Sequence, residues 1–165
     1  MTDPAAQRKK STKVAKPYKP TERELVATAN YNERKANKPP FPYLNVNVTD
    51  AGTAQVGADH GDMKTAQELM MNGFGTSDER LFNGLTHQLA SLVAKGSVPD
   101  EAELNQVVAF VRAVSPQDDL EAMLATQMAA VHFATMECVK RAHIESQPAE
   151  FRQANLNQVN KLSRT

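Results

Sequence analysis

The sequence predicts a mainly α-helical protein: a helical bundle with one long C-terminal helix, a small β-hairpin and a disordered basic N-terminal arm. Two observations carry this prediction. The 165-residue chain has no Trp and few aromatic residues, so Leu, Met, Val and Ala must fill its core, as they do between packed helices. After residue 57, apolar residues recur at helical spacing between capping residues, whereas strict alternation is confined to one short stretch.

The N-terminal segment, residues 1–20, predicts a disordered arm. It is basic, contains prolines and holds too few large apolar side chains to offset the entropy cost of ordering. A helix is predicted from Thr21 to Asn37, because Thr21 and Glu24 form a capping box at its start. The prolines at 39, 40 and 42 then forbid a helix and impose an extended linker.

One stretch has a β-like pattern. From residue 43 to 48, Leu44, Val46 and Val48 alternate with polar side chains, and a turn and a return strand at 50–56 follow. An isolated two-stranded hairpin is barely stable in water. The hairpin must therefore dock on the helices, pair with another chain or stay mobile.

Three helices are predicted between residues 62 and 114. The first runs from Asp62 to Asn72 and stops at Gly73. The second opens with a capping box at 76–79 and ends at Lys95 and Gly96, which suit the negative helix end and a left-handed cap. The third begins within residues 97–100, and its apolar stripe comprises Leu104, Val107, Val108 and Val111.

The longest helix is predicted from Pro116 to about Ser146, roughly 45 Å at 1.5 Å per residue, with Ser115 as its cap. Its apolar seam comprises Leu120, Leu124, Met128, Val131, Thr135 and Cys138. Two interpretations of this seam stay open: packing within one chain, and helix–helix contact between copies in a homo-oligomer. Pro148 breaks the helix, and a shorter one follows at 149–162.

These elements suggest three segments: the arm at 1–20; a helix, linker and hairpin at 21–57; and a helical domain at 58–165. Charge divides along the chain in a similar way. Residues 1–40 carry ten basic and four acidic side chains, whereas residues 41–165 carry nine and fifteen, so the net charges are +6 and −6. This separation indicates an arm that contacts nucleic acid or an acidic partner, unless the arm is merely solvated or folds back.

The candidate binding residues of the arm are its basic side chains: Arg8, Lys9, Lys10, Lys13, Lys16 and Lys19. Aromatic side chains are interleaved with the basic residues of this region, at Tyr18, Tyr31, Phe41 and Tyr43. Phosphate contacts from the cations together with stacking of the rings on bases would suit nucleic acid.

No catalytic or metal site is predicted, and no cofactor. Cys138 lies on the apolar seam, where a buried and inert thiol is expected. Asp59, His60 and Asp62 lie beside glycines and are of the residue types that ligate metals, but a helix-capping turn is the preferred interpretation. An enzyme would need residues such as His87 to converge with His60 and Asp59 on a cleft. The chain is therefore expected not to be an enzyme.

The composition also indicates a compartment. A single cysteine permits no intramolecular disulfide, which favours a reducing, cytoplasmic setting. No run of about 18 apolar residues is present, and the charged N-terminus lacks the apolar stretch of a secretory signal, so no membrane partner is expected.

Four stretches resemble a family of uncharacterised alphaproteobacterial proteins whose genes often lie near prophages or other mobile elements. They are KPTERELVATANYNERKANKPPFPYLNV (19–46), LFNGLTHQLASLVAKG (81–96), DEAELNQVVAFVRAVSPQDDLEAMLATQMAAVHFATMECVKRA (100–142) and NKLSRT (160–165). The resemblance implies a phage-like or mobile-element accessory protein. It also implies that relatives continue past residue 165 with another helical stretch. The family has no established activity, so it assigns no functional residues.

Together, these observations predict a non-enzymatic, oligomerising helical adaptor with a basic arm for nucleic acid or an acidic partner. The alternative is a structural assembly protein that binds only other proteins, through the hairpin and the seam of the helix at 116–146.

Overall fold

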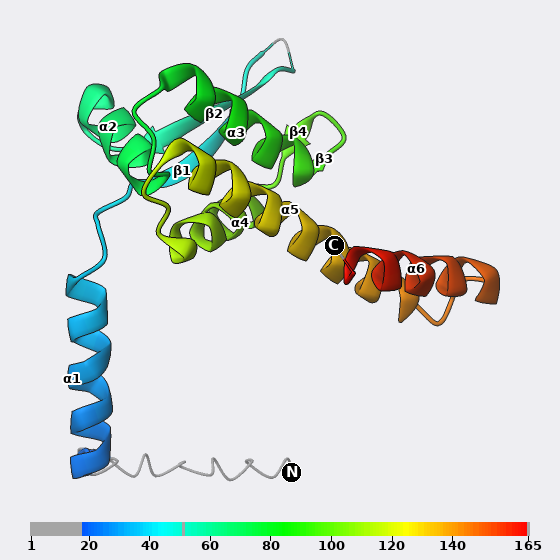
Figure 1. The fold of residues 1–165 in the computed structure, drawn as a ribbon, viewed down its shortest axis with the longest axis horizontal. Helices are drawn as coiled ribbons and strands as arrows, with labels where there is room; N and C mark the ends of the chain where they lie inside the picture. Colours follow the sequence, from blue (N-terminus) through cyan, green and yellow to red (C-terminus); the bar gives the residue numbers. More distant parts are fainter. Residues whose placement is uncertain (1–17, 51, 165) are drawn as a thin grey trace, which may run out of the picture. The chain divides into compact units, whose positions relative to one another are not determined.

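The computed structural model describes residues 18–50 and 52–164. Within these residues the fold is mainly helical, with six helices, a long helix near the C-terminus and small antiparallel hairpins, as predicted (Figure 1). The elements are α1 (Glu22–Ala36), β1 (Tyr43–Val48), β2 (Ala54–Asp59), α2 (Met63–Gly73), α3 (Glu79–Leu92), β3 (Ala94–Lys95), β4 (Val98–Pro99), α4 (Glu101–Val114), α5 (Asp119–Ala142) and α6 (Ala149–Leu162). The chain divides into two compact units, with the boundary between Lys38 and Pro39. The first hairpin, β1–β2, belongs to the second unit.

Helix α1 belongs to the first unit and has the predicted capping box. The Glu24 N–H donates to the Thr21 hydroxyl at 3.4 Å, and the Thr21 N–H donates to the Glu24 carboxylate at 2.7 Å. Hydrogen bonds from the Tyr18 hydroxyl and from Thr21 hold the pKa of Glu24 below its ordinary value. None of the helix's residues is buried, and a 15-residue helix is marginal alone in water. Its own caps therefore matter to its stability.

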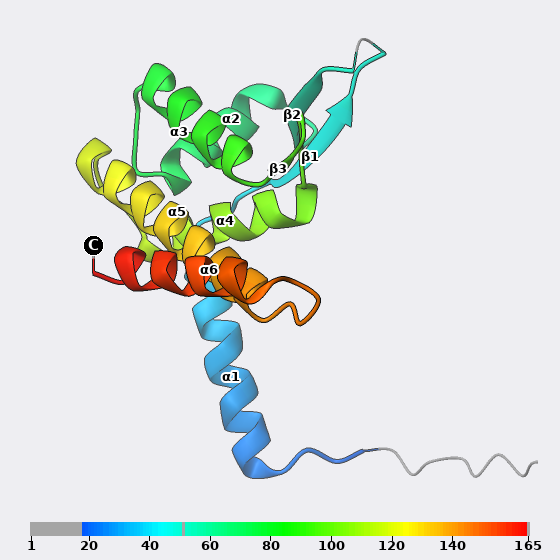
Figure 2. The same ribbon diagram turned by 90° about the vertical axis from the view of Figure 1, so that its right-hand side faces the viewer.

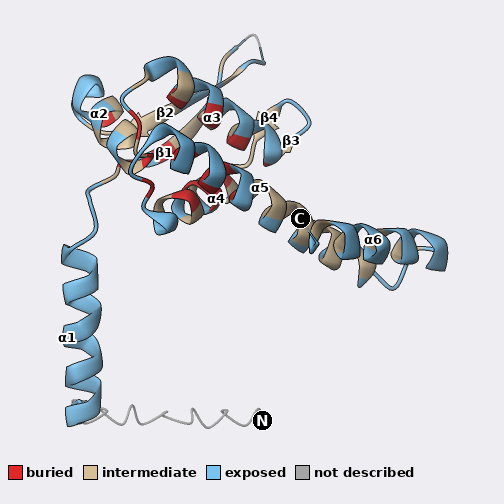
Figure 3. Cartoon of the chain, viewed as in Figure 1, coloured by how far each residue is buried: buried red, intermediate tan, exposed pale blue. Residues whose placement is uncertain are grey.

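The core of the second unit lies between α3, α4 and the first half of α5 (Figure 3). Phe74, which follows α2, is completely buried and meets the Phe82 ring edge to face, with 5.4 Å between centroids. The predicted apolar stripe of α4 is fully buried: Leu104, Val107, Val108 and Val111. Among the described residues, no helix combines the length and apolar character needed to cross a membrane.

The first hairpin contacts α4 through strand β1. The Leu44 N–H donates to the Asn105 side-chain oxygen at 2.9 Å, and the Asn105 amide donates to the Leu44 carbonyl at 2.7 Å. The Val46 N–H donates to the Glu101 carboxylate at 2.9 Å. Of the three expectations for this hairpin, docking on the helices is the one observed. The return strand also extends further than expected, to Asp59.

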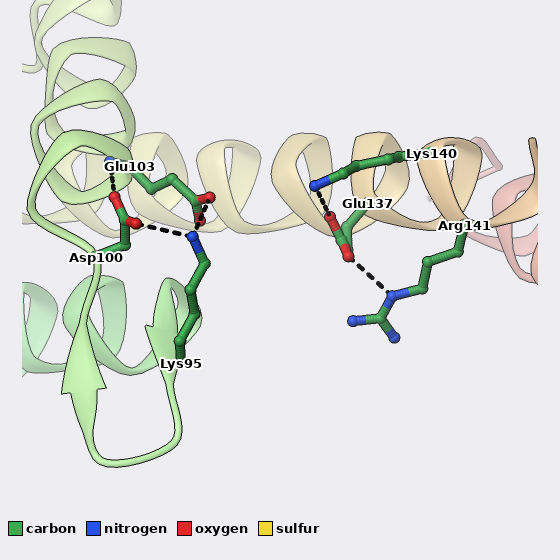
Figure 4. Close-up of polar contacts among 6 residues, drawn as sticks. All are labelled: Lys95, Asp100, Glu103, Glu137, Lys140 and Arg141. Atoms are coloured by element: carbon green, nitrogen blue, oxygen red, sulfur yellow. Dashed lines mark hydrogen bonds and ion pairs between the residues drawn. The ribbon is translucent and has the colours of Figure 1, made fainter. Parts of the chain in front are cut away.

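The second hairpin, β3–β4, was not predicted and corrects the expected end of α3. The helix stops at Leu92, and Gly96, with φ of +75°, lies in the turn between the two short strands. Lys95 bridges Asp100 and Glu103 at 2.8 and 3.1 Å (Figure 4), and its ammonium holds the pKa of Asp100 below the ordinary range. A positive φ suits a hairpin turn as well as a helix cap, so Gly96 alone does not distinguish them.

Two predicted helix starts were also wrong by a few residues. Helix α3 is capped by Asp78 rather than by Thr76, whose buried hydroxyl instead accepts the Asp78 N–H at 3.1 Å. Helix α5 is capped by Asp118, because Ser115 ends α4 in the left-handed region with φ of 57°. Pro116 is buried in the connection. Helix α5 thus has 24 residues, about 36 Å, and ends before Ser146.

Replacing Asn105 tests the docking of the hairpin. The N105A variant leaves the partly buried N–H and C=O of Leu44 without partners. We expect a loss of about 1–3 kcal/mol in the free energy of unfolding, measured by denaturant titration. The matched control is N47A, on the exposed part of β1, which should change stability by less than about 0.5 kcal/mol. Equal effects of the two substitutions would contradict the docking role.

Candidate functional site

Helix α5 packs into the core through its small side chains. Ala122, Ala125 and Ala129 are completely buried, and they join the core cluster with residues of α3 and α4. Thr126 is buried on the same face, where its hydroxyl donates to the Ala122 carbonyl at 2.9 Å. Methyl-sized side chains let helix axes approach closely, so this face leaves no room for the larger apolar residues of α5.

The large apolar side chains in the first half of α5 therefore face solvent. Leu120 is 64% exposed, Met128 is 53% exposed, and Met123 and Leu124 are each 50% exposed. This result corrects one interpretation of the predicted seam. Its first half, Leu120, Leu124 and Met128, is at least half exposed and stays outside the buried core, because the alanines occupy the inward face.

A groove of about 530 Å³ runs between α3 and α5 beside these exposed side chains. Its lining residues on α3 are Arg80, Leu81, Gly84, Leu85, Gln88 and Leu89, and those on α5 are Leu120, Met123, Leu124, Thr126, Gln127 and Ala130. Gly84 is exposed in the middle of α3, and a Cβ atom added there would meet no atom within 4 Å. We call this surface the α3–α5 groove. It is apolar at its base, and Arg80 is the one charged residue among those lining it.

The second half of the predicted seam has a different environment. Val131, Thr135 and Cys138 are half-buried, in the part of α5 beside α6 (Figure 2). The Thr135 hydroxyl donates to the Val131 carbonyl at 2.7 Å. Cys138 was expected to be buried, but it is only partly buried in the structure. The predicted seam is thus divided between an exposed half and a covered half.

The far end of the α5–α6 pair is polar. Glu137 bonds to Arg141 at 2.9 Å and to Lys140 at 3.7 Å, one turn along the same helix (Figure 4). These pairs are exposed and contribute little to stability. Phe151 and Met136 are also more than half exposed on these two helices.

A larger hollow of about 830 Å³ lies on the other side of α3. It is bounded by β2, α2, α3 and the second hairpin, and its base includes Phe74, Phe82 and Leu104. His87 lines it, whereas His60 and Asp59 are not among its lining residues. His87, His60 and Asp59 therefore do not meet in this hollow, as the enzyme interpretation would require.

The Asp59–Asp62 segment forms the expected capping turn. The Asp62 carboxylate accepts the Thr65 N–H at 2.9 Å and caps α2, while the His60 ring nitrogen Nδ1 accepts the Asp62 N–H at 3.0 Å. Hydrogen bonds from the Thr65 hydroxyl and N–H hold the pKa of Asp62 below its ordinary value. Within 18–50 and 52–164, no three His, Cys, Asp or Glu side chains are grouped as metal ligands.

The predicted binding arm lies mostly outside the described residues. Arg8, Lys9, Lys10, Lys13 and Lys16 fall within 1–17, whereas Lys19 is exposed just before α1. One aromatic residue of this region requires a correction. Phe41 stacks on Phe74 with 6.5 Å between ring centroids, and the Arg112 guanidinium lies 4.1 Å over its ring, so it is not free to stack on a base. Tyr18, Tyr31 and Tyr43 are exposed.

Comparisons with protein-family models, curated proteins and solved structures find no match for this chain. The resemblance to the alphaproteobacterial family therefore stays a prediction, and the candidate site stands on its geometry alone.

Two neighbouring substitutions on α5 test its orientation. The A129L variant forces a large side chain between α5 and the core, so we expect a loss of about 1–3 kcal/mol in the free energy of unfolding. The M128A variant removes a solvent-facing side chain, and we expect a change within about 0.5 kcal/mol. Denaturant titration at the lowest practical protein concentration measures both. The reverse order of effects would mean that the large side chains face inward.

Proposed function

We propose that the protein is a non-enzymatic helical adaptor that self-associates through the α3–α5 groove and presents a basic arm. The observation that carries this proposal is the orientation of α5. A helix that buries its alanines and exposes Leu120, Met123, Leu124 and Met128 is poorly suited to a monomer, because large apolar side chains are stabilised by removal from water.

A second copy of the chain is the partner that this surface suits best. The groove has an apolar base and uncharged side chains at its centre, such as Gln88 and Gln127, so two copies meet without strong like-charge repulsion. Gly84 provides a low point on α3 where another helix can approach closely. Burying four half-exposed Leu and Met side chains on each copy is worth on the order of 1 kcal/mol per side chain.

The charge separation supports the second part of the proposal. Residues 1–40 carry ten basic side chains against four acidic ones, and Lys19 and the side chains of α1 are exposed. Self-association would place several arms on one particle and so raise the avidity for a polyanion. A nucleic-acid accessory of a phage or mobile element, in the cytoplasm, agrees with this combination and with the family resemblance.

The alternative function, a purely protein–protein assembly protein, is favoured by one observation. The α3–α5 groove lies entirely in the second unit, residues 39–165, whose charge is net acidic. Such a unit can associate without the arm. The two functions share the same interface and differ only in what the arm does.

Light scattering and sedimentation as functions of concentration test the interface. We expect the L124S and G84L variants each to weaken self-association at least about tenfold. L124S removes an exposed apolar contact, whereas G84L fills the groove and meets no atom of its own chain near its Cβ. G84L also replaces a helix-interior glycine, so its fold should be at least as stable as the parent.

The matched control is M136S, which removes an exposed methionine elsewhere on α5 and should leave self-association unchanged. A parent chain that is monomeric at every concentration would contradict the proposed interface, as would equal weakening by M136S and L124S.

Salt titration of DNA binding tests the arm. We expect a labelled duplex to bind the full chain with an affinity that falls as salt rises, because each neutralised phosphate releases a counterion. Deleting residues 1–20 should abolish this binding and leave self-association intact. The absence of DNA binding would favour the purely protein–protein alternative, and DNA binding that survives the deletion would contradict the role of the arm.

A further inference from the structure

We infer that the free edge of β2 is a docking site for an extended, basic peptide segment, which adds a third strand to the first hairpin. The site lies in the larger hollow, on the side of α3 opposite the α3–α5 groove. The residues lining the two surfaces do not overlap. The inference is therefore independent of the proposed self-association.

The hydrogen-bond pattern of the hairpin shows which backbone groups are free. In an antiparallel pair, residues alternate between those that bond to the partner strand and those that point away from it. Leu44 and Val46 point away from β2, because their N–H groups donate to side chains of α4. Their register partners, Ala58 and Val56, must then point away from β1.

The two edges of this small sheet are consequently unequal. Asn105 and Glu101 satisfy the outer edge of β1. On β2, the Ala58 carbonyl accepts the His60 N–H at 3.0 Å, whereas the N–H and carbonyl of Val56 form no backbone hydrogen bond with any described loop, turn or cap. Exposed edges are normally blocked by Lys, Pro or a covering element. The sequence of β2, AQVGAD, contains neither Lys nor Pro.

The hollow beside this edge has the form that a strand needs. Ala54, Val56 and Ala58 line one wall, and side chains of α3, including Asn83 and His87, line the opposite wall. The base is apolar and buried, so it suits the alternate side chains of a strand that point inward. Six residues of β2 extend about 20 Å, which matches a six-residue peptide.

The charges around the hollow indicate that the peptide is basic. Glu79 is the one carboxylate among the described residues that line the hollow, and none of them is Lys or Arg. The unit as a whole, residues 39–165, carries an excess of acidic side chains. A peptide with small apolar residues at alternate positions and Lys or Arg between them complements both the base and the surrounding charge.

The probe is a peptide selected from a displayed library of random nonapeptides for binding to the full chain. The test compares the binding of this peptide to the parent chain and to the V56P variant. Proline at 56 removes an N–H that points away from β1, so it deletes a bond to the added strand without deleting one within the hairpin. We expect a selected peptide to bind V56P at least about tenfold more weakly than the parent chain. Methylating the peptide nitrogen opposite Val56 should weaken binding to the parent similarly.

Hydrogen exchange of the backbone amides shows whether the hairpin stays folded in V56P and whether the peptide covers Val56. In the free chain, Gln55 and Gly57 should be protected and Val56 should exchange rapidly, and V56P should retain the protection of Gly57. Peptide binding should protect Val56. Selection of no peptide whose binding depends on Val56 would overturn the inference. Protection of Val56 that rises with protein concentration in the absence of peptide would assign the edge to a second copy and overturn the peptide assignment.

Discussion

The close approach of α5 to the core is the constraint on which the account depends. Ala122, Ala125 and Ala129 fill the space between α5 and the helices beneath it. Because side chains at these positions face inward, the helical period turns Leu120, Leu124 and Met128 outward. The exposed apolar face is thus a geometric consequence of the buried one. This exposed face is the reason that we propose a partner for α5, because burying it would remove further apolar surface from water.

Helix α3 separates the two surfaces to which we assign binding. Leu81 and Gly84 belong to the α3–α5 groove, whereas Asn83 and His87 face the hollow beside β2. The buried residues Phe82, Leu85 and Leu89 hold the helix in the core between them. The hairpin is fixed from the other side by α4, which leaves the edge of β2 open. One rigid helix therefore positions two chemically different surfaces, one suited to apolar helix packing and one to backbone pairing.

Much of the fold could be predicted from the sequence, because strong local signals carry it. The capping box of α1, the stripe of α4 and the bounds of α6 are all recognisable from capping residues and helical spacing. Two misses involve residues at positive φ: Gly96 was expected to end a helix and instead lies in a hairpin turn, and Ser115 ends α4 where it was expected to cap α5. The candidate site could be predicted only in part. The apolar seam of α5 was identified from the sequence, but its separation into an exposed half and a covered half was not. Helical spacing alone does not say whether the alanines or the leucines face the core.

The most direct test of the account is the distance between α5 helices of two copies. Cys138 is the only cysteine, so C138S combined with Q127C places one nitroxide label in the α3–α5 groove. Helices that pack directly lie about 8–10 Å apart, so we predict an intermolecular label distance on the order of 20 Å by pulsed electron paramagnetic resonance. A label at position 164 serves as the control. The absence of short distances at Gln127, under conditions where sedimentation shows association, would contradict the account.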